Sequence, residues 1–324
     1  MKITILDDYL HAVEKLTCFE LLKGQNVQVF YHAEQNTNRL VEMLLDTEIL
    51  VLTRERTEIS EALLQRLPHL KLISQTGKIS NHLDLSLCTK YGVAVAEGIG
   101  SPVAPAELAW ALLMNTVRQI PQSIASMKAG KWQSTIGQTV HGKTIGIWGY
   151  GKIGQRMAQY AKVFGATVLV WGSATSREKA LADGFEAAPD KDYFFRNVDV
   201  VTLHLRLNDQ TRGIVQKTDL LNLKDGAALI NTARAELIET GALQSVIESG
   251  KDLFVGTDVY ENEPILDKDF ALLHKHNVVC TPHLGYVEQN GFELYFGKAF
   301  ENALNYINGN PTNVANPEVL TGPR

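Results

Sequence analysis

Short apolar segments alternate with longer amphipathic segments along the chain. In the first hundred residues, segments between the apolar stretches, such as Ile59–Leu67, carry apolar residues at helical spacing. Strands that alternate with helices predict a parallel sheet covered on both faces. The predicted strands are Ile3–Leu6, Ile49–Leu52, Leu70–Ser74 and Val93–Ala96.

A second series of alternating segments follows and fits a doubly wound, dinucleotide-binding sheet. Between the two series, the apolar stretch in Pro105–Arg118 predicts a helix buried on several sides. We favour a domain seam for it, with a dimer interface or a plain core as alternatives. The predicted strands of this series are Thr144–Trp148, Thr167–Trp171, Val198–Leu203, Ala227–Asn231, Leu253–Thr257 and Val278–Cys280.

The end of the chain predicts a helix over Asn290–Asn308 followed by a polar tail, and this helix is expected to return to the first domain. One domain is therefore inserted into the other. We expect residues 1–100 and 286–324 to form the outer domain and residues 101–285 to form the inserted one.

Composition and charge narrow the classes of function. The 324 residues suit about two domains, and 45% hydrophobic with 21% charged residues is ordinary for a globular protein. A net charge of −5 does not favour nucleic-acid binding. No apolar run approaches the roughly 20 residues of a membrane span, and the start of the chain lacks a signal peptide's apolar stretch. Three distant cysteines indicate a reducing, cytoplasmic setting without a metal cluster.

A glycine loop follows the strand that ends at Trp148 and opens a helix that runs to about Phe164. Its glycines are spaced GxGxxG, which permits a tight turn, close approach of a pyrophosphate and close packing of helix on strand. The helix N-terminus offers free N–H groups to that anion. A glycine turn without a ligand is the alternative. The loop residues expected to bind cofactor are Gly149, Gly151, Lys152, Ile153 and Gly154.

The next strand ends without the acidic residue that holds the adenosine ribose of NAD. Gly172 stands there, and Ser173 and Arg177 follow. Hydroxyl groups and an arginine suit a 2′-phosphate, so the sequence favours NADP over NAD. The alternative is that Arg177 is solvated and either cofactor binds.

Three polar residues follow three predicted strands of the second series: Arg234, Glu263 and His283. Carboxyl ends of parallel strands lie at one edge of a sheet, where ligands bind. Arginine can hold a carboxylate and polarise a carbonyl, and histidine can donate a proton to an alkoxide. A carboxylate beside the histidine would favour its charged form. Each residue alone could be structural, but their common position predicts a catalytic set.

These segments resemble the D-isomer-specific 2-hydroxyacid dehydrogenases over nearly the whole chain. The similarity lies in HGKTIGIWGYGKIG, DVVTLHLRLNDQTRGIV, ALINTARAELI, GTDVYENEP and VVCTPHLGY. The resemblance implies that Arg234 binds substrate, that Glu263 partners His283 and that His283 is the acid/base. It also implies that Asp258 contacts the nicotinamide carboxamide and that Thr232 and Ala233 lie along the cofactor.

In the first domain, QTGKISNHLDL resembles the family loop whose backbone N–H groups hold the substrate carboxylate. The resemblance implies this role for Gly77, Lys78 and Ile79, with an ordinary loop as the alternative. It further implies a flavodoxin-like substrate domain, an inserted Rossmann domain, a site in the cleft and a homodimer formed through the cofactor domain. Trp132 and Tyr286 are expected to line the cleft, although Trp132 could equally pack in a core or interface.

Four positions depart from the family pattern. Ile79 and Ala235 stand where glycines are usual, Arg206 replaces a proline near the adenine side, and Gly172 replaces the acid. They bear on substrate and cofactor choice rather than on the reaction class. Lys78 is a further open position, for which we favour a solvated side chain over a substrate contact.

The sequence therefore predicts an NAD(P)-dependent reductase that converts a small 2-keto acid into a D-2-hydroxy acid. Oxidation of phosphite or formate on the same fold is one alternative, although related formate dehydrogenases carry glutamine at the position of Glu263. A dinucleotide-sensing corepressor is another. Which keto acid is used and in which direction the reaction runs stay open.

Overall fold

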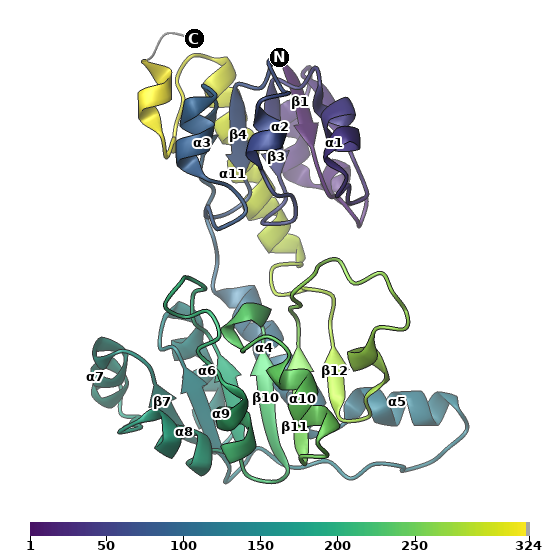
Figure 1. Ribbon diagram of the computed structural model, residues 1–324, viewed down its shortest axis with the longest axis vertical. Helices are drawn as coiled ribbons and strands as arrows, with labels where there is room; N and C mark the ends of the chain where they lie inside the picture. Colours follow the sequence, from purple (N-terminus) through teal and green to yellow (C-terminus); the bar gives the residue numbers. More distant parts are fainter. Residues whose placement is uncertain (322–324) are drawn as a thin grey trace. The chain divides into compact units, whose positions relative to one another are not determined.

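The structure is a computed structural model that describes residues 1–321 and divides the chain into two units (Figure 1). The first unit comprises Met1–Ser101 together with the chain from Glu288 onward, and the second comprises Pro102–Val287. The predicted boundaries, after residues 100 and 285, lie one and two residues earlier. The second unit is therefore inserted in the sequence of the first.

The first unit contains a five-stranded sheet in the order β2-β1-β3-β4-β5, and every pairing is parallel. The central β3 is buried along its whole length, which explains its continuous apolar sequence. The sequence analysis missed β2, an edge strand whose NVQV sequence is half polar. The strands are β1 (Lys2–Ile5), β2 (Asn26–Val29), β3 (Ile49–Leu52), β4 (Leu72–Gln75) and β5 (Ala94–Ala96).

Helices cover both faces of this sheet. Leu44, Leu63 and Cys88 from three helices pack in one apolar cluster with sheet residues such as Leu50. On the other face the long C-terminal helix lies against β4, where the Ser74 hydroxyl donates to the Ala299 carbonyl at 2.8 Å. The helices are α1 (Thr37–Leu44), α2 (Glu61–Leu64), α3 (Leu85–Lys90) and α11 (Gln289–Ile307), with 3-10 turns η1 (Val13–Lys15), η2 (Thr17–Leu22) and η5 (Pro317–Leu320).

The second unit contains a seven-stranded parallel sheet in the order β12-β11-β10-β9-β6-β7-β8. The chain proceeds from β6 to one side and then returns to its other side at β9, so a topological switch lies between β6 and β9. The predicted doubly wound fold is confirmed. The strands are β6 (Thr144–Trp148), β7 (Thr167–Trp171), β8 (Glu186–Ala187), β9 (Val200–Leu203), β10 (Ala227–Asn231), β11 (Leu253–Thr257) and β12 (Val278–Cys280).

Two layers of helices enclose this second sheet (Figure 1). Helix α4 packs against α6, β10 and β11, and its Ala109 and Leu113 are buried there, so the unit's own core accounts for the apolar stretch. Phe194 and Val246 belong to the cluster on the other face. The helices are α4 (Val103–Val117), α5 (Ile120–Lys128), α6 (Lys152–Val163), α7 (Ala174–Ala182), α8 (Lys191–Asn197), α9 (Lys217–Asn222) and α10 (Ala242–Glu248), with 3-10 turns η3 (Ala235–Leu237) and η4 (Ala271–His274).

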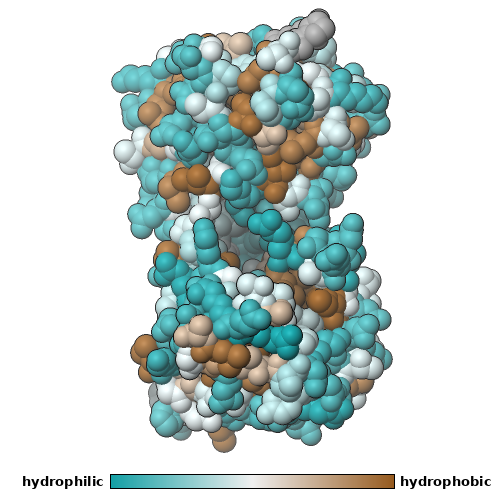
Figure 2. Space-filling view, turned by 90° about the vertical axis from the view of Figure 1, so that its left-hand side faces the viewer, coloured by the Kyte–Doolittle hydropathy of each residue, from teal (hydrophilic) through white to brown (hydrophobic). Residues whose placement is uncertain are grey.

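Hydrophilic side chains cover most of the face shown in Figure 2, and apolar side chains form small separate patches on it. Within residues 1–321, the search for a helix with the length and hydropathy of a membrane span finds none.

Candidate active site

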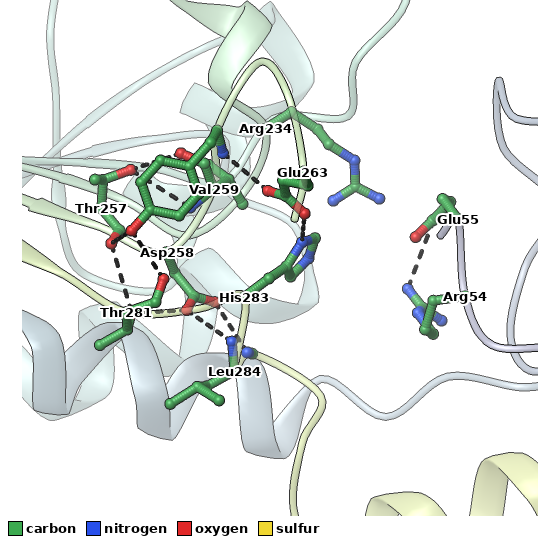
Figure 3. Close-up of polar contacts among 12 residues, drawn as sticks. Arg54, Glu55, Arg234, Thr257, Asp258, Val259, Glu263, Thr281, His283 and Leu284 are labelled. Atoms are coloured by element: carbon green, nitrogen blue, oxygen red, sulfur yellow. Dashed lines mark hydrogen bonds and ion pairs between the residues drawn. The ribbon is translucent and has the colours of Figure 1, made fainter. Parts of the chain in front are cut away.

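The three candidate catalytic side chains follow three adjacent strands of the second unit (Figure 3). Arg234 comes after β10, Glu263 after β11 and His283 after β12. Because these strands are parallel neighbours, their carboxyl ends meet at one edge of the sheet. The fold thus brings the predicted set to one place.

Glu263 and His283 form the polar pair of this site. The Nδ1 atom of His283 lies 2.6 Å from Oε2 of Glu263, and the two side chains are 28% and 31% exposed. The other carboxylate oxygen accepts the Tyr260 N–H at 2.8 Å, so the acid is held from two sides. A carboxylate at Nδ1 requires a proton there, which leaves Nε2 to exchange protons with a substrate.

The loop that carries His283 is fixed by the buried Asp258. One oxygen of Asp258 accepts the Thr281 hydroxyl and the Leu284 N–H, both at 2.7 Å, and the other accepts the Gly285 N–H at 2.9 Å. Burial raises the pKa of Asp258, and the hydrogen bond from Thr281 opposes that rise. His283 has a φ of 52°, a conformation that a residue with a β-carbon adopts only when its surroundings hold it. Asp258 is therefore a scaffold for the histidine loop, and its contact with a nicotinamide stays a prediction.

Hydrogen bonds from the Asn231 side chain hold the turn that carries Arg234. The Asn231 side chain accepts the Ala233 N–H at 3.0 Å and donates to the Arg234 carbonyl at 2.9 Å. The Arg234 guanidinium donates to the Ala233 carbonyl at 2.6 Å. Thr232 and Ala233 are partly exposed on the same turn, consistent with their predicted place beside a cofactor.

The glycine loop lies between the ends of β7 and β9. Gly149 has a φ of 100°, its N–H donates to the Trp171 carbonyl, and a β-carbon on it would lie 2.8 Å from the His204 carbonyl oxygen. A β-carbon on Gly154 would overlap the Gly149 carbonyl, so α6 can start this close to the strand only with glycine. No atom lies within 4 Å of the corresponding position on Gly151. Lys152 and Ile153 form the first turn of α6, so the loop fits a dinucleotide pyrophosphate.

The turn after β7 carries the three residues predicted to bind a 2′-phosphate, and each of them has different contacts in the structure. Gly172 has a φ of 154°, and Ser173 caps α7 by accepting the Ser176 N–H at 3.2 Å. The Arg177 guanidinium donates to the Ala188 and Pro189 carbonyls at 3.5 and 3.2 Å and lies over the Trp171 ring. One guanidinium nitrogen of Arg177 thus bonds the protein itself, and its predicted contact with a 2′-phosphate stays a prediction.

A carboxylate from the same chain occupies part of the predicted substrate loop in the first unit. Oε1 of Glu97 accepts the Ile79 N–H at 3.1 Å, and Oε2 lies 2.7 Å from Nζ of Lys78. Lys78 thus has an ion-pair partner, and its side chain is 62% exposed, so its contact with a substrate stays a prediction. Within residues 1–321, the Lys78 N–H donates to no protein acceptor. Gly77 alone of the three has a positive φ, so the turn accommodates the β-branched Ile79.

Comparison with known proteins identifies the family. Residues 110–285 match the sequence family "D-isomer specific 2-hydroxyacid dehydrogenase, NAD binding domain". The chain belongs to this family. It is 32% identical over 264 residues to D-3-phosphoglycerate dehydrogenase of Bacillus subtilis, covering 81% of this chain and 50% of that protein. It is 33% identical over 258 residues to hydroxypyruvate reductase of Thermotoga maritima, covering 78% and 82%.

A solved relative matches the whole dehydrogenase fold. The crystal structure of phosphoglycerate oxidoreductase from Vibrio cholerae O395 is 54% identical, with a TM-score of 0.94, over 95% of this chain and 99% of that one. The chain spans about half the length of the D-3-phosphoglycerate dehydrogenases that it matches.

Sequence reasoning missed two residues, one in each unit, that hold loops predicted to bear site residues. The Tyr260 hydroxyl donates a hydrogen bond to the Thr281 carbonyl at 3.0 Å, and this bond holds the loop before His283. Glu97 was missed as the partner of the first unit's loop. No spacing pattern identifies these residues, because each contact joins segments that are distant in the chain.

Two aromatic residues named from the sequence have different surroundings. Tyr286 is buried, and its ring centroid lies 5.7 Å from that of His283. Trp132 is 77% exposed, which excludes the alternative of packing in a core, while its positions in a cleft or at an interface stay predictions. Within residues 1–321, no group of three His, Cys, Asp or Glu side chains is placed to hold a metal ion.

Proposed function

We propose that this protein is a nicotinamide-dependent reductase that converts a small 2-keto acid into a D-2-hydroxy acid. The observation that carries the proposal is the 2.6 Å pair of Glu263 and His283, beside Arg234 at adjacent strand ends. A bound nicotinamide dinucleotide supplies the hydride. The glycine loop at the same edge of the sheet is the place for its pyrophosphate.

The residues of the pair divide the acid/base work. His283 gives the proton on Nε2 to the carbonyl oxygen as that oxygen gains charge. Glu263 accepts the hydrogen bond from Nδ1 and fixes the orientation of the ring. Arg234 holds the substrate carboxylate and stabilises the developing charge. Run in reverse, the same groups accept the proton from a hydroxy acid.

The test is His283→Ala, with His274→Ala as a matched control. His274, the last residue of η4, is exposed and hydrogen-bonds the Lys268 carbonyl, away from the candidate set. Loss of NADH and NADPH absorbance is followed with glyoxylate, hydroxypyruvate, pyruvate and phenylpyruvate. We expect His283→Ala to lose nearly all turnover while it still quenches fluorescence on binding cofactor. Turnover by His283→Ala like that of the unmodified protein would refute the mechanism.

The substrate panel also identifies the keto acid. Relatives are named for phosphoglycerate, hydroxypyruvate and glyoxylate, and these names define the range of small acids to test. Turnover of phosphite or formate in place of every keto acid would assign a different reaction to the same groups. Tight cofactor binding without any turnover would indicate a sensing role.

We infer that NADP is preferred over NAD. The turn after β7 carries no carboxylate in Gly172 and Ser173, and the Ser173 hydroxyl is exposed there. Ser173→Asp keeps a good helix cap and adds a negative charge that repels a 2′-phosphate, whereas Ser173→Asn keeps the cap without the charge. We expect only the aspartate variant to raise the KM for NADPH, by about tenfold or more. Equal effects of both variants would contradict the preference.

We also propose a homodimer built on α5 and the segment after it. Ile124, Met127, Trp132 and Ile136 are exposed apolar residues in this region of the second unit. Burying them against a second copy would remove that surface from water. Light scattering should give twice the chain mass, and Ile136→Lys should give a monomer; a monomeric unmodified protein would refute the proposal.

A cytoplasmic setting is inferred from Cys18, Cys88 and Cys280, which are unpaired thiols.

A further inference from the structure

Arg206 lies close to the glycine loop, on the side opposite β7. Strand β6 leads into that loop, with β9 paired on one side and β7 on the other. A β-carbon on Gly149 would lie 2.8 Å from the His204 carbonyl, and one on Gly172 would lie 3.8 Å from the Gly149 nitrogen. The loop therefore touches the segment after each neighbouring strand. Arg206 follows His204 by two residues.

The backbone around Arg206 is held in place while its side chain is exposed. The Thr211 hydroxyl donates to the Arg206 carbonyl at 2.7 Å and accepts the Asn208 N–H at 2.8 Å. Within residues 1–321, no carboxylate lies within ion-pair distance of the Arg206 guanidinium, and the residue is exposed. Because the turn is already ordered, binding an anion would restrict only the side chain.

Neighbouring arginines are engaged by the protein itself. Arg177, which the sequence favoured for a 2′-phosphate, donates to the Ala188 and Pro189 carbonyls. Arg212 lies 3.9 Å from the Glu236 carboxylate. Arg206 thus offers a guanidinium that forms no ion pair within residues 1–321, whereas Nη1 of Arg177 already bonds two carbonyls.

We propose that Arg206 binds the 2′-phosphate of NADP. This inference rests on the proposed NADP preference. It places the positive charge that binds the 2′-phosphate at the end of β9. Neighbouring strands are about 4.8 Å apart, so the ends of β9 and β7 are separated by about 10 Å across β6. An arginine side chain on one side and the exposed turn at Ser173 on the other can meet a phosphate between them. The planar guanidinium suits two phosphate oxygens at once.

Calorimetry with fragments of the cofactor tests Arg206 without any turnover. The probes are 2′,5′-ADP, which carries the 2′-phosphate, and 5′-AMP, which lacks it. We expect Arg206→Gln to weaken 2′,5′-ADP binding about tenfold and to change 5′-AMP binding less than twofold. Arg206→Lys should recover part of the loss because it restores the charge without the planar fork.

Arg212→Gln is the matched control, because it removes a nearby exposed arginine that is paired with Glu236. It should bind both probes like the unmodified protein. Thermal unfolding of all variants checks that they remain folded. Unchanged 2′,5′-ADP binding in Arg206→Gln, or equal losses for both probes, would overturn the assignment.

The outcomes separate this inference from the proposed function. If the unmodified protein binds both probes equally, the NADP preference and the role of Arg206 both fail. Reduction of a keto acid with NADH would still stand, because it depends on Arg234, Glu263 and His283. If no keto acid is turned over but Arg206→Gln loses 2′,5′-ADP selectively, the reductase proposal fails and the Arg206 assignment survives.

Discussion

Replacing Glu263 with glutamine removes the negative charge beside His283 while keeping nearly the same side-chain size and shape. The Tyr260 N–H bonds one carboxylate oxygen, so the glutamine oxygen takes that position and its NH₂ group faces Nδ1 of His283. Two donors then oppose each other unless Nδ1 gives up its proton. The charged imidazolium, which has a proton on both nitrogens, loses its partner. The variant therefore loses the acceptor that holds the Nδ1 proton while Nε2 exchanges its proton with the substrate.

The size of the effect follows from this hydrogen bond. Both side chains are about 30% exposed and 2.6 Å apart, and a hydrogen bond to a charged group contributes about 1.5–3 kcal/mol. If the bond is made in the transition state, its loss lowers kcat/KM roughly 10- to 150-fold.

The assay is the initial rate of NADPH or NADH consumption between about pH 5 and pH 9, with cofactor binding measured separately by fluorescence. Glu263→Gln should bind cofactor normally and lose rate at every pH. Glu261→Gln, which removes an exposed carboxylate two residues earlier, is the control and should keep its rate. A Glu263→Gln rate within about twofold of the unmodified protein across this range would refute the argument.

Three further predictions concern the scaffold. Asp258→Asn should lower the free energy of unfolding by about 1–3 kcal/mol in urea titrations, because one buried N–H of the histidine loop then faces an amide NH₂. Burial lowers the pKa of His204 to about 3, so the unfolded chain binds its proton first as the pH falls below about 6.5. Stability is then lost toward pH 3, by about 2 kcal/mol between pH 7 and pH 5, and His204→Asn should flatten that dependence. Gly154→Ala should weaken cofactor binding measured by fluorescence, since its β-carbon overlaps the Gly149 carbonyl; unchanged affinity would contradict that reading of the loop.

Strands buried on both faces were the easiest elements to predict. The observed bounds of β6 and β10 equal the predicted ones, because central parallel strands have a mostly apolar sequence over their whole length. The edge strands β2 and β8 were missed. One is half polar and the other has two residues, so neither carries that signal.

The positions of the residues at strand ends could be predicted from the sequence, but their hydrogen-bond partners could not. Parallel pairing alone places Arg234, Glu263 and His283 at one edge. The bonds of Arg177 to the Ala188 and Pro189 carbonyls, and of Glu97 to the Ile79 N–H, depend on how separate loops pack. No local pattern records such contacts, so the sequence could not predict the partners of Arg177, Lys78 and Ile79.

The insertion of the second unit has a consequence for synthesis on the ribosome. All strands of the second unit have been made once Cys280 is added, so this unit can fold while the chain is still growing. The first unit has its five strands much earlier, yet it lacks the helix that covers β4 and the Asn316 side chain that bonds the Val93 carbonyl and the Val95 N–H. Its sheet therefore stays uncovered on one face until α11 has been made. Of the two units, the one that begins first is completed after the other.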